Sequence, residues 1–291
     1  MSDSFQVVLI SPPGYVHAQA FTEIVETLFY GLKGLGYDVS RETNRMVPGA
    51  RAVLVGAHLL PAGQMERVPA GTVIYNLEQV NPDSPVWSPA YVKLLARSEV
   101  WDYSRRNIDG LAALGAGGAR HVPVGYVPEL TRIVPLDRED IDVLFYGCLN
   151  DRRTQVIKEA GDLGLNVKAV FGVYGENRDA LIARSKVVLN LHYYDSKIFE
   201  IVRVSYLLAN SKAVVSEYHA GTEIEGDLTD AVRLASYGEL ARACRELAAD
   251  DKGRRKLASR GFERITARNE VNILRGILCG DPDRGRAGEA K

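Results

Sequence analysis

The chain has little cysteine, no excess of charge of either sign and no long apolar run. Its three cysteines are widely spaced and lack the paired spacing of a zinc site or a disulfide framework. The formal net charge is −1, which excludes a field that would gather nucleic acid over the whole surface. No apolar stretch approaches the roughly 18 residues of a membrane span. We therefore expect a cytoplasmic protein with reduced thiols, no nucleic-acid partner and at most peripheral contact with a membrane.

Several chemical signatures are also missing or stand in the wrong context. There is no phosphate-loop lysine motif and no Gly-x-Ser-x-Gly elbow. The glycines at 115, 117 and 118 follow a predicted helix, so they do not fit a dinucleotide fingerprint. Asp140 and Asp142 have the spacing of a metal-binding pair, but they precede a predicted strand where such a pair would follow one. We expect no essential metal and no bound cofactor.

What the chain does have is a repeated alternation of short apolar strands and amphipathic helices. Hydrophobic residues make up 46% of the sequence, enough for packed cores. In the N-terminal half, the pattern predicts a strand over 6–10, a helix over 18–35 and further strands over 37–40, 52–55 and 72–76. This order is typical of an α/β fold with parallel sheets.

A second β/α series begins near residue 143, after a segment that reads as a connection. Residues 127–139 contain two prolines and few periodic apolar positions, as a link between domains would. We predict an N-terminal domain over 1–130, a second domain over 131–268, and a C-terminal helix with a loose tail over 269–291. At 291 residues, size alone allows one large domain or two smaller ones.

Cationic residues follow two strands of the second series. Asn150 and Arg153 open a predicted helix, where free N–H groups and a guanidinium favour an anion. The plain alternative is that Asn150 only caps the helix. Lys197, Glu200 and Arg203 recur at helical spacing after the strand over 187–191, so we expect them to face one cleft. An exposed ion pair of Glu200 with a neighbouring cation is the other interpretation.

Other residues near predicted strand ends complete the candidate site. Gly172, Val173 and Tyr174 would let the backbone approach a nucleoside base, although the segment is equally ordinary as a turn. Three candidates could act on a proton or on the reacting centre, namely His17, Glu78 and Glu200. A lone histidine is more often a structural residue. The remaining expected cleft residues are Gly14, His192 and Glu217.

Two stretches resemble the two-domain GT-B class of glycosyltransferases, specifically its group-1-like members. In residues 197–217 an arginine-containing helix leads through a small-residue turn to a strand that ends in Ser216-Glu217. The charged helices over 236–247 and 254–264 resemble the usual C-terminal helices of that class. The N-terminal half matches in its pattern alone. Tyr206 stands where many retaining members carry a second glutamate, and residues 211–213 replace their Gly-x-Pro.

The resemblance implies two Rossmann-like β/α/β domains that face a central cleft, with the acceptor on the N-terminal side and a nucleotide-sugar donor on the C-terminal side. It implies transfer of a sugar to a glycan, lipid-linked or small-molecule acceptor without a metal. Asn150, Arg153, Lys197 and Arg203 would then meet the charge of the donor diphosphate. Two alternatives stay open, a catalytically inactive relative that binds a sugar nucleotide or glycan and a Rossmann-like interaction module.

Overall fold

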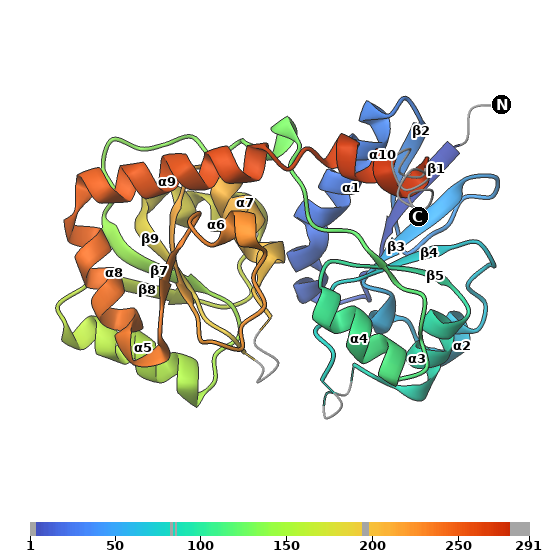
Figure 1. Ribbon diagram of the computed structural model, residues 1–291, viewed down its shortest axis with the longest axis horizontal. Coiled ribbons are helices and arrows are strands. Elements are labelled where there is room, and N and C mark those ends of the chain that lie inside the picture. The colour runs from blue at the N-terminus through green and yellow to red at the C-terminus, as the bar shows by residue number, and fades with distance from the viewer. Residues whose placement is uncertain (1–3, 82–83, 85, 194–197, 280–291) are drawn as a thin grey trace, which may run out of the picture.

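The computed structural model describes residues 4–81, 84, 86–193 and 198–279. It contains two parallel sheets in two lobes that lie side by side (Figure 1). The expected α/β fold with two Rossmann-like domains is therefore confirmed. Within the described residues, no helix is long and apolar enough to cross a membrane.

The N-terminal lobe is built on a six-stranded sheet in the order β2-β1-β3-β4-β5-β6. Its strands are β1 (Ser4–Leu9), β2 (Asp38–Thr43), β3 (Arg51–Val55), β4 (Val73–Asn76), β5 (Glu99–Asp102) and β6 (Arg120–His121). Its helices are α1 (Thr22–Gly34), α2 (Ala62–Met65), α3 (Pro89–Ala96) and α4 (Arg105–Ala113), with short 3-10 turns at Val16–Phe21 and Ala57–Leu59. The chain passes from β1 to β2 on one side and to β3 on the other, so the sheet has a switch point between β1 and β3.

Helix α1 shows why these elements form where they do. Ile24, Leu28 and Leu32 recur at a spacing of four and are buried against the sheet. Just past the end of the helix, Gly36 adopts a φ of +90°, which residues with a side chain rarely adopt. The helix therefore ends close to the point that the sequence predicts.

The C-terminal lobe is built on a five-stranded sheet in the order β11-β10-β9-β7-β8. Its strands are β7 (Ile141–Tyr146), β8 (Val167–Val170), β9 (Ser185–Asn190), β10 (Ala213–Glu217) and β11 (Arg233–Ala235). Its helices are α5 (Asp151–Asp162), α6 (Gly175–Arg184), α7 (Ile201–Ala209), α8 (Leu240–Ala249) and α9 (Asp251–Thr266). Here the chain order reverses between β7 and β9, which makes this pair the switch point.

The last helix, α10 (Glu270–Leu278), leaves the C-terminal lobe and packs on α1 of the N-terminal lobe (Figure 1). Glycine on α1 makes room for it, because a Cβ added at Gly31 would lie 2.6 Å from Cγ of Glu270. Where the chain passes from one lobe to the other before α10, it is also held by a backbone hydrogen bond, since Tyr126 N donates to Arg268 O at 2.7 Å. The two lobes are thus joined by two neighbouring crossings of the chain.

A carboxylate from the C-terminal lobe completes the start of α4 in the N-terminal lobe. Glu223 accepts hydrogen bonds from the backbone N–H groups of Arg105 and Arg106, at 3.0 and 3.2 Å, and from the hydroxyl of Ser104. A negative charge is favourable at this end of a helix. This contact is a further link between the two lobes.

Candidate functional site

A cavity of about 460 Å³ lies between the lobes, at the carboxyl ends of both sheets. This is the expected ligand position in open parallel sheets. From the N-terminal lobe it is lined by His17, Ala20, Phe21, Glu23, Leu77, Glu78, Gln79 and Tyr103. From the C-terminal lobe it is lined by Tyr146, Gly147, Cys148, Arg153, Val170, Phe171, Gly172, Val173, Tyr174, Arg178, Tyr193, Glu200, Val202, Arg203 and Tyr206.

Two arginines and a glutamate meet at the switch point of the C-terminal sheet. Arg153 follows β7, and Glu200 and Arg203 follow β9. The Glu200 carboxylate lies 3.1 Å from Nη2 of Arg153 and 2.8 Å from Nη1 of Arg203, so it bridges the two guanidinium groups. Burial lowers the pKa of Arg153, and the nearby Glu200 carboxylate opposes that shift. The arrangement is a cationic corner that one internal carboxylate partly neutralises.

The loop between β7 and α5 shapes this corner. Asn150 caps α5, since its side-chain oxygen accepts from Arg153 N at 2.9 Å, and Arg153 Nη1 donates to the carbonyl of Cys148 at 2.8 Å. Gly147 has a φ of +145°, and a Cβ placed there would lie 3.0 Å from Nη2 of Arg203. A glycine at 147 therefore lets the Arg203 guanidinium approach the backbone beside Arg153.

A buried ion pair closes the back of the cavity and joins the lobes. Arg178 of α6 donates to Glu23 of α1 at 2.7 Å, and both side chains are almost inaccessible to solvent. Arg178 also lies over the ring of Tyr206, whose hydroxyl donates to Asp179 at 2.8 Å. Arg132, from the connection between the lobes, donates to the same hydroxyl at 3.0 Å. Tyr206 is therefore part of a polar network at the lobe contact.

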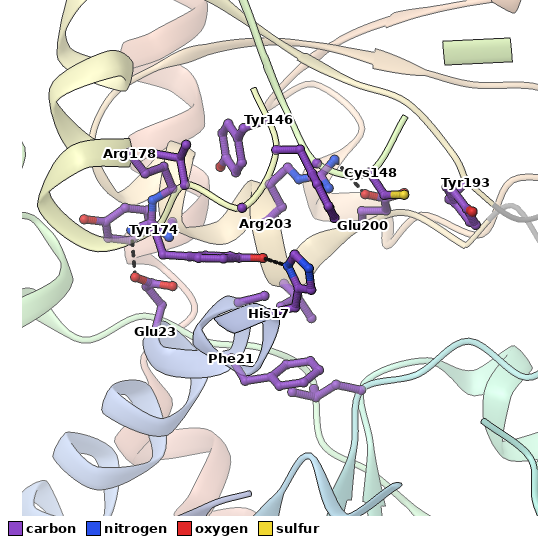
Figure 2. Close-up of a pocket in the computed structure, with 18 of the residues that line it drawn as sticks. His17, Phe21, Glu23, Tyr146, Cys148, Tyr174, Arg178, Tyr193, Glu200 and Arg203 are labelled. Atoms are coloured by element: carbon purple, nitrogen blue, oxygen red, sulfur yellow. Dashed lines mark hydrogen bonds and ion pairs between the residues drawn. The ribbon is translucent and has the colours of Figure 1, made fainter. Parts of the chain in front are cut away.

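His17 reaches across the cavity to the C-terminal lobe, as Figure 2 shows. Its Nδ1 lies 2.8 Å from the hydroxyl of Tyr174, and its ring stacks on Phe171 with centroids 4.6 Å apart. Tyr15 contacts the same imidazole edge-on. Gly172, between the two aromatic residues of the C-terminal lobe, adopts a φ of +71°. These residues form an aromatic group at the cavity that spans both lobes.

The carboxyl of Glu78 lines the cavity. Among the described residues it has no hydrogen-bond donor at 3.4 Å or less, unlike the other carboxyls of the cavity lining. Burial raises its pKa to about 7. Nε2 of His58 lies 3.5 Å from its Oε1, and burial lowers the pKa of that imidazole to about 4. The Glu78 backbone is held firmly, because its carbonyl accepts from the side-chain amides of Asn76 and Asn107 at 2.9 and 3.0 Å.

Four of the expected site residues do not line the cavity. Gly14 lies in an exposed turn, and the Asn150 side chain caps its own helix. Glu217 pairs with Arg152, which together with neighbouring groups outweighs the effect of burial and leaves the pKa of Glu217 lowered. His192 is buried, and within the described residues neither of its ring nitrogens has a hydrogen-bond partner.

One detail of the predicted pattern is wrong. Helix α7 begins at Ile201, so Glu200 immediately precedes the helix instead of lying within it. Just before α7, Phe199 N donates to the carbonyl oxygen of Glu223, so this part of the chain is not helical. Glu200 and Arg203 still pair, at the first turn. Lys197 itself lies outside the described residues.

Sequence reasoning missed several residues that reach the cavity through tertiary contacts. These are His58 behind Glu78 and the cavity residues Phe21, Glu23, Tyr103, Tyr146, Cys148, Arg178 and Tyr193. One signal was available, since Glu23 is a carboxylate on the otherwise apolar face of α1. A charged group there requires a buried partner, which the sequence does not identify. Among the described residues, no group of three or more histidine, cysteine or acidic side chains is placed to hold a metal ion.

Together these groups give the cavity two chemically different walls. The C-terminal wall carries guanidinium groups at a sheet switch point, which suits an anion such as a diphosphate. The N-terminal wall carries a carboxyl whose pKa lies near neutrality, which suits proton transfer. The aromatic group around His17 provides flat apolar surface between them.

The fold is similar to that of solved glycosyltransferase structures. HepE of Anabaena, in complex with UDP and glucose, matches with a TM-score of 0.59 and 14% identity over 94% of this chain and 98% of that one. WaaG, a glycosyltransferase involved in lipopolysaccharide biosynthesis, matches with a TM-score of 0.58 and 11% identity over 95% and 100% of the two chains. Sucrose-phosphate synthase of Thermosynechococcus elongatus matches with a TM-score of 0.57 and 15% identity over 98% and 100%. At these identities the likeness establishes the fold, which is the GT-B arrangement.

Sequence comparisons add little to this likeness. No family model matches the chain. An uncharacterized protein, L138 of Acanthamoeba polyphaga mimivirus, is 35% identical over 81 residues, which is 27% of this chain and 9% of the viral protein. The chain therefore spans a small part of that relative.

Proposed function

We propose that the protein is a metal-independent glycosyltransferase that moves a hexosyl or related sugar from a nucleotide-sugar donor to a glycan, lipid-linked or small-molecule acceptor. The observation that carries the proposal is the pair of guanidinium groups, Arg153 and Arg203, at the switch point beside a cavity between two Rossmann-like lobes. HepE, which shares the fold, has been crystallised with UDP and with UDP-glucose. A nucleoside diphosphate sugar is therefore the donor class that fits best.

The transfer step divides between the two walls. The bond between the anomeric carbon and the diphosphate oxygen breaks, and its electron pair leaves with the diphosphate. Arg153 and Arg203 meet the negative charge that develops there, which is the function that a metal ion would otherwise serve. The acceptor oxygen forms the new bond to the anomeric carbon and loses its proton to a base on the N-terminal wall.

Glu78 suits the role of that base better than His17. Its carboxyl lines the cavity, and burial places its pKa at about 7, near the pH at which a base works best. His17 is hydrogen-bonded to Tyr174 and stacked on Phe171, which suits contact with the nucleoside side of the donor. Gly172, Val173 and Tyr174 keep their proposed role beside the nucleoside. Glu200 faces both arginines and acts as their positioning carboxylate.

The donor site is tested with Arg203→Gln. Titration calorimetry with UDP and UDP-glucose should show affinity about tenfold to a hundredfold weaker than for the unchanged protein, because charge-assisted bonds to a phosphate are lost. Arg264→Gln is the matched control, since Arg264 pairs with Asp230 at 2.8 Å on the outer surface of α9. Equal affinity in both variants would contradict the placement of the diphosphate.

A catalytically inactive relative is the second candidate, because Tyr206 occupies the position of a glutamate and is tied to Asp179 and Arg132. Measuring UDP binding and UDP-glucose hydrolysis on the same sample distinguishes an active transferase from an inactive relative. Binding without hydrolysis, and without transfer to any acceptor offered, would favour the inactive relative. If a thermal-shift screen finds no stabilising nucleoside diphosphate, an interaction module becomes the better description.

A further inference from the structure

The N-terminal sheet brings a buried histidine directly behind the cavity carboxyl of Glu78. The chain turns after β3 at Gly56, where φ is +79° and an added Cβ would lie 3.2 Å from the carbonyl oxygen of Ile10. His58 follows two residues later, in the 3-10 turn Ala57–Leu59 that comes after β3, the strand next to the switch point of this sheet. Its side chain is 10% exposed, and that of Glu78 is 21% exposed toward the cavity.

Aromatic contacts fix the orientation of this imidazole. Phe21 and Tyr91 both meet it edge-on, with ring centroids 6.0 and 6.1 Å away. Its one polar contact among the described residues is Oε1 of Glu78, 3.5 Å from Nε2. Contacts of this kind are often long in unliganded sites and shorten when substrate closes the cavity.

The backbone at Glu78 is also held by side-chain hydrogen bonds, which fix the point from which its carboxyl extends. Asn76 and Asn107 both bind the Glu78 carbonyl and both donate to Asp102, at 2.6 and 3.2 Å. The hydroxyl of Tyr91 donates to Asn76 at 3.0 Å, so the residue that packs on His58 also joins this network. The cluster that holds the Glu78 backbone is thus also in contact with the ring of His58.

We infer that His58 is a positioning residue, whose imidazole N–H holds the Glu78 carboxylate toward the cavity as the group that receives the proton of the acceptor hydroxyl. This inference rests on the proposed function. The proton moves from the acceptor oxygen to a Glu78 oxygen as that acceptor oxygen bonds to the anomeric carbon. His58 stays neutral throughout, in agreement with burial, which lowers its pKa to about 4.

Several other titratable groups face Glu78 and have to be kept constant in a test. They are the phenols of Tyr15, Tyr91 and Tyr103 and, through the asparagine network, the carboxyl of Asp102, whose pKa burial raises to about 7. None of them carries a positive charge. Within the described residues, the side-chain nitrogen that contacts the Glu78 carboxyl is Nε2 of His58, at 3.5 Å, and the inference assigns the N–H to this nitrogen.

The test is a carbon-13 NMR titration of the Glu78 carboxyl in protein labelled at glutamate, with the signal assigned by its loss in Glu78→Gln. His58→Phe keeps a ring but removes the N–H, so the pKa of Glu78 should rise by about one unit, as expected when a bond to the charged form is lost. His58→Gln retains an N–H donor and should bring the pKa back to within a few tenths of a unit. His121→Phe is the matched control, because His121 also lies near a glutamate, 3.6 Å from Glu225, but outside the cavity lining.

An unchanged pKa of Glu78 in His58→Phe would overturn the inference. A fall would overturn it too, because a fall means that the imidazole accepts a hydrogen bond from the protonated carboxyl and stabilises the neutral form. Circular dichroism melts verify that each variant is folded. If His58→Phe does not fold, the pKa of Glu78 in His58→Gln is the deciding measurement. UDP affinity is measured in parallel and should stay within twofold, since His58 lies in the N-terminal lobe. If the unchanged protein does not bind UDP at all, the proposed function is contradicted instead.

Discussion

Replacing Glu200 by glutamine should destabilise the unliganded protein and strengthen its binding of UDP. Glu200 is the countercharge shared by Arg153 and Arg203, at 3.1 and 2.8 Å, and the three side chains are 15%, 3% and 18% exposed. Breaking a fully buried ion pair costs about 3–5 kcal/mol. Because Arg153 keeps the Cys148 carbonyl and Arg203 keeps Asn190 as acceptors, we expect a loss of roughly 2–3 kcal/mol.

Two effects on UDP affinity oppose each other in this variant. The loss of Glu200 removes a negative charge that competes with the diphosphate, but it also removes a group that orients the arginines. The remaining acceptors, the Cys148 carbonyl and the Asn190 side chain, keep both guanidinium groups close to their positions. The charge effect should therefore dominate and tighten UDP binding several-fold.

The assay is thermal unfolding with and without UDP. Without ligand, Glu200→Gln should lower Tm by about 4–10 °C for a protein of this size. With UDP the deficit should shrink. Glu246→Gln is the matched control, because Glu246 also has two arginine neighbours, Arg233 and Arg242, but on an exposed face of α8 where such pairs contribute about 0–1 kcal/mol. If Glu200→Gln weakens UDP binding, Glu200 is a ligand contact and the reasoning is wrong.

Two further predictions concern the contact between α1 and α10. Burial raises the pKa of Glu270 from its usual 4.5 to about 8, so the folded protein binds the extra proton and stability should fall as pH rises from 5 to 8. In Glu270→Gln the amide oxygen can still accept a hydrogen bond from Gly125 N. Urea unfolding should therefore give the same free energy of unfolding as the unchanged protein at pH 5 and one that is larger by roughly 2–4 kcal/mol at pH 8. An equal dependence of stability on pH in both proteins would refute this. Gly31→Ala should cost about 1–3 kcal/mol, since its Cβ would lie 2.6 Å from Cγ of Glu270 and 2.9 Å from Leu274, whereas Gly276→Ala in open space on α10 should gain about 0.5–1 kcal/mol. Similar values for the two alanines would show that α10 does not pack on α1 as described.

The alternation of strands and helices was predictable because it depends on local physics. Gly36 stops α1, and Ser88 and Ser104 cap α3 and α4 through their side chains. The edge strand β11, over Arg233–Ala235, escaped prediction because three residues carry too little pattern to distinguish a strand from a loop. The helical spacing of Glu200 with Arg203 placed Glu200 inside a helix, whereas α7 begins at Ile201, a difference within the usual uncertainty of helix ends.

Part of the site was predictable for a similar reason. Arg153 and Arg203 stand next to the ends of β7 and β9, and ligands bind at such ends in parallel sheets. The pairing of Glu23 with Arg178 was not predictable, because it joins residues 155 positions apart on different lobes. His58 escaped for a related reason, although it lies in the same lobe as Glu78. It comes after β3 and Glu78 comes after the neighbouring strand β4, and local sequence does not encode the contact between them.

The packing of α10 on α1 has a consequence for the order in which the protein can fold during synthesis. Leu274 and Glu270 belong to the core of the lobe that the ribosome makes first, although they are among the last described residues of the chain. Domains usually fold as units while the rest of the chain emerges. Here Leu274 can cover α1 only after the second lobe has been synthesised, so the part of α1 that it covers stays exposed until then, which is the kind of surface that chaperones protect.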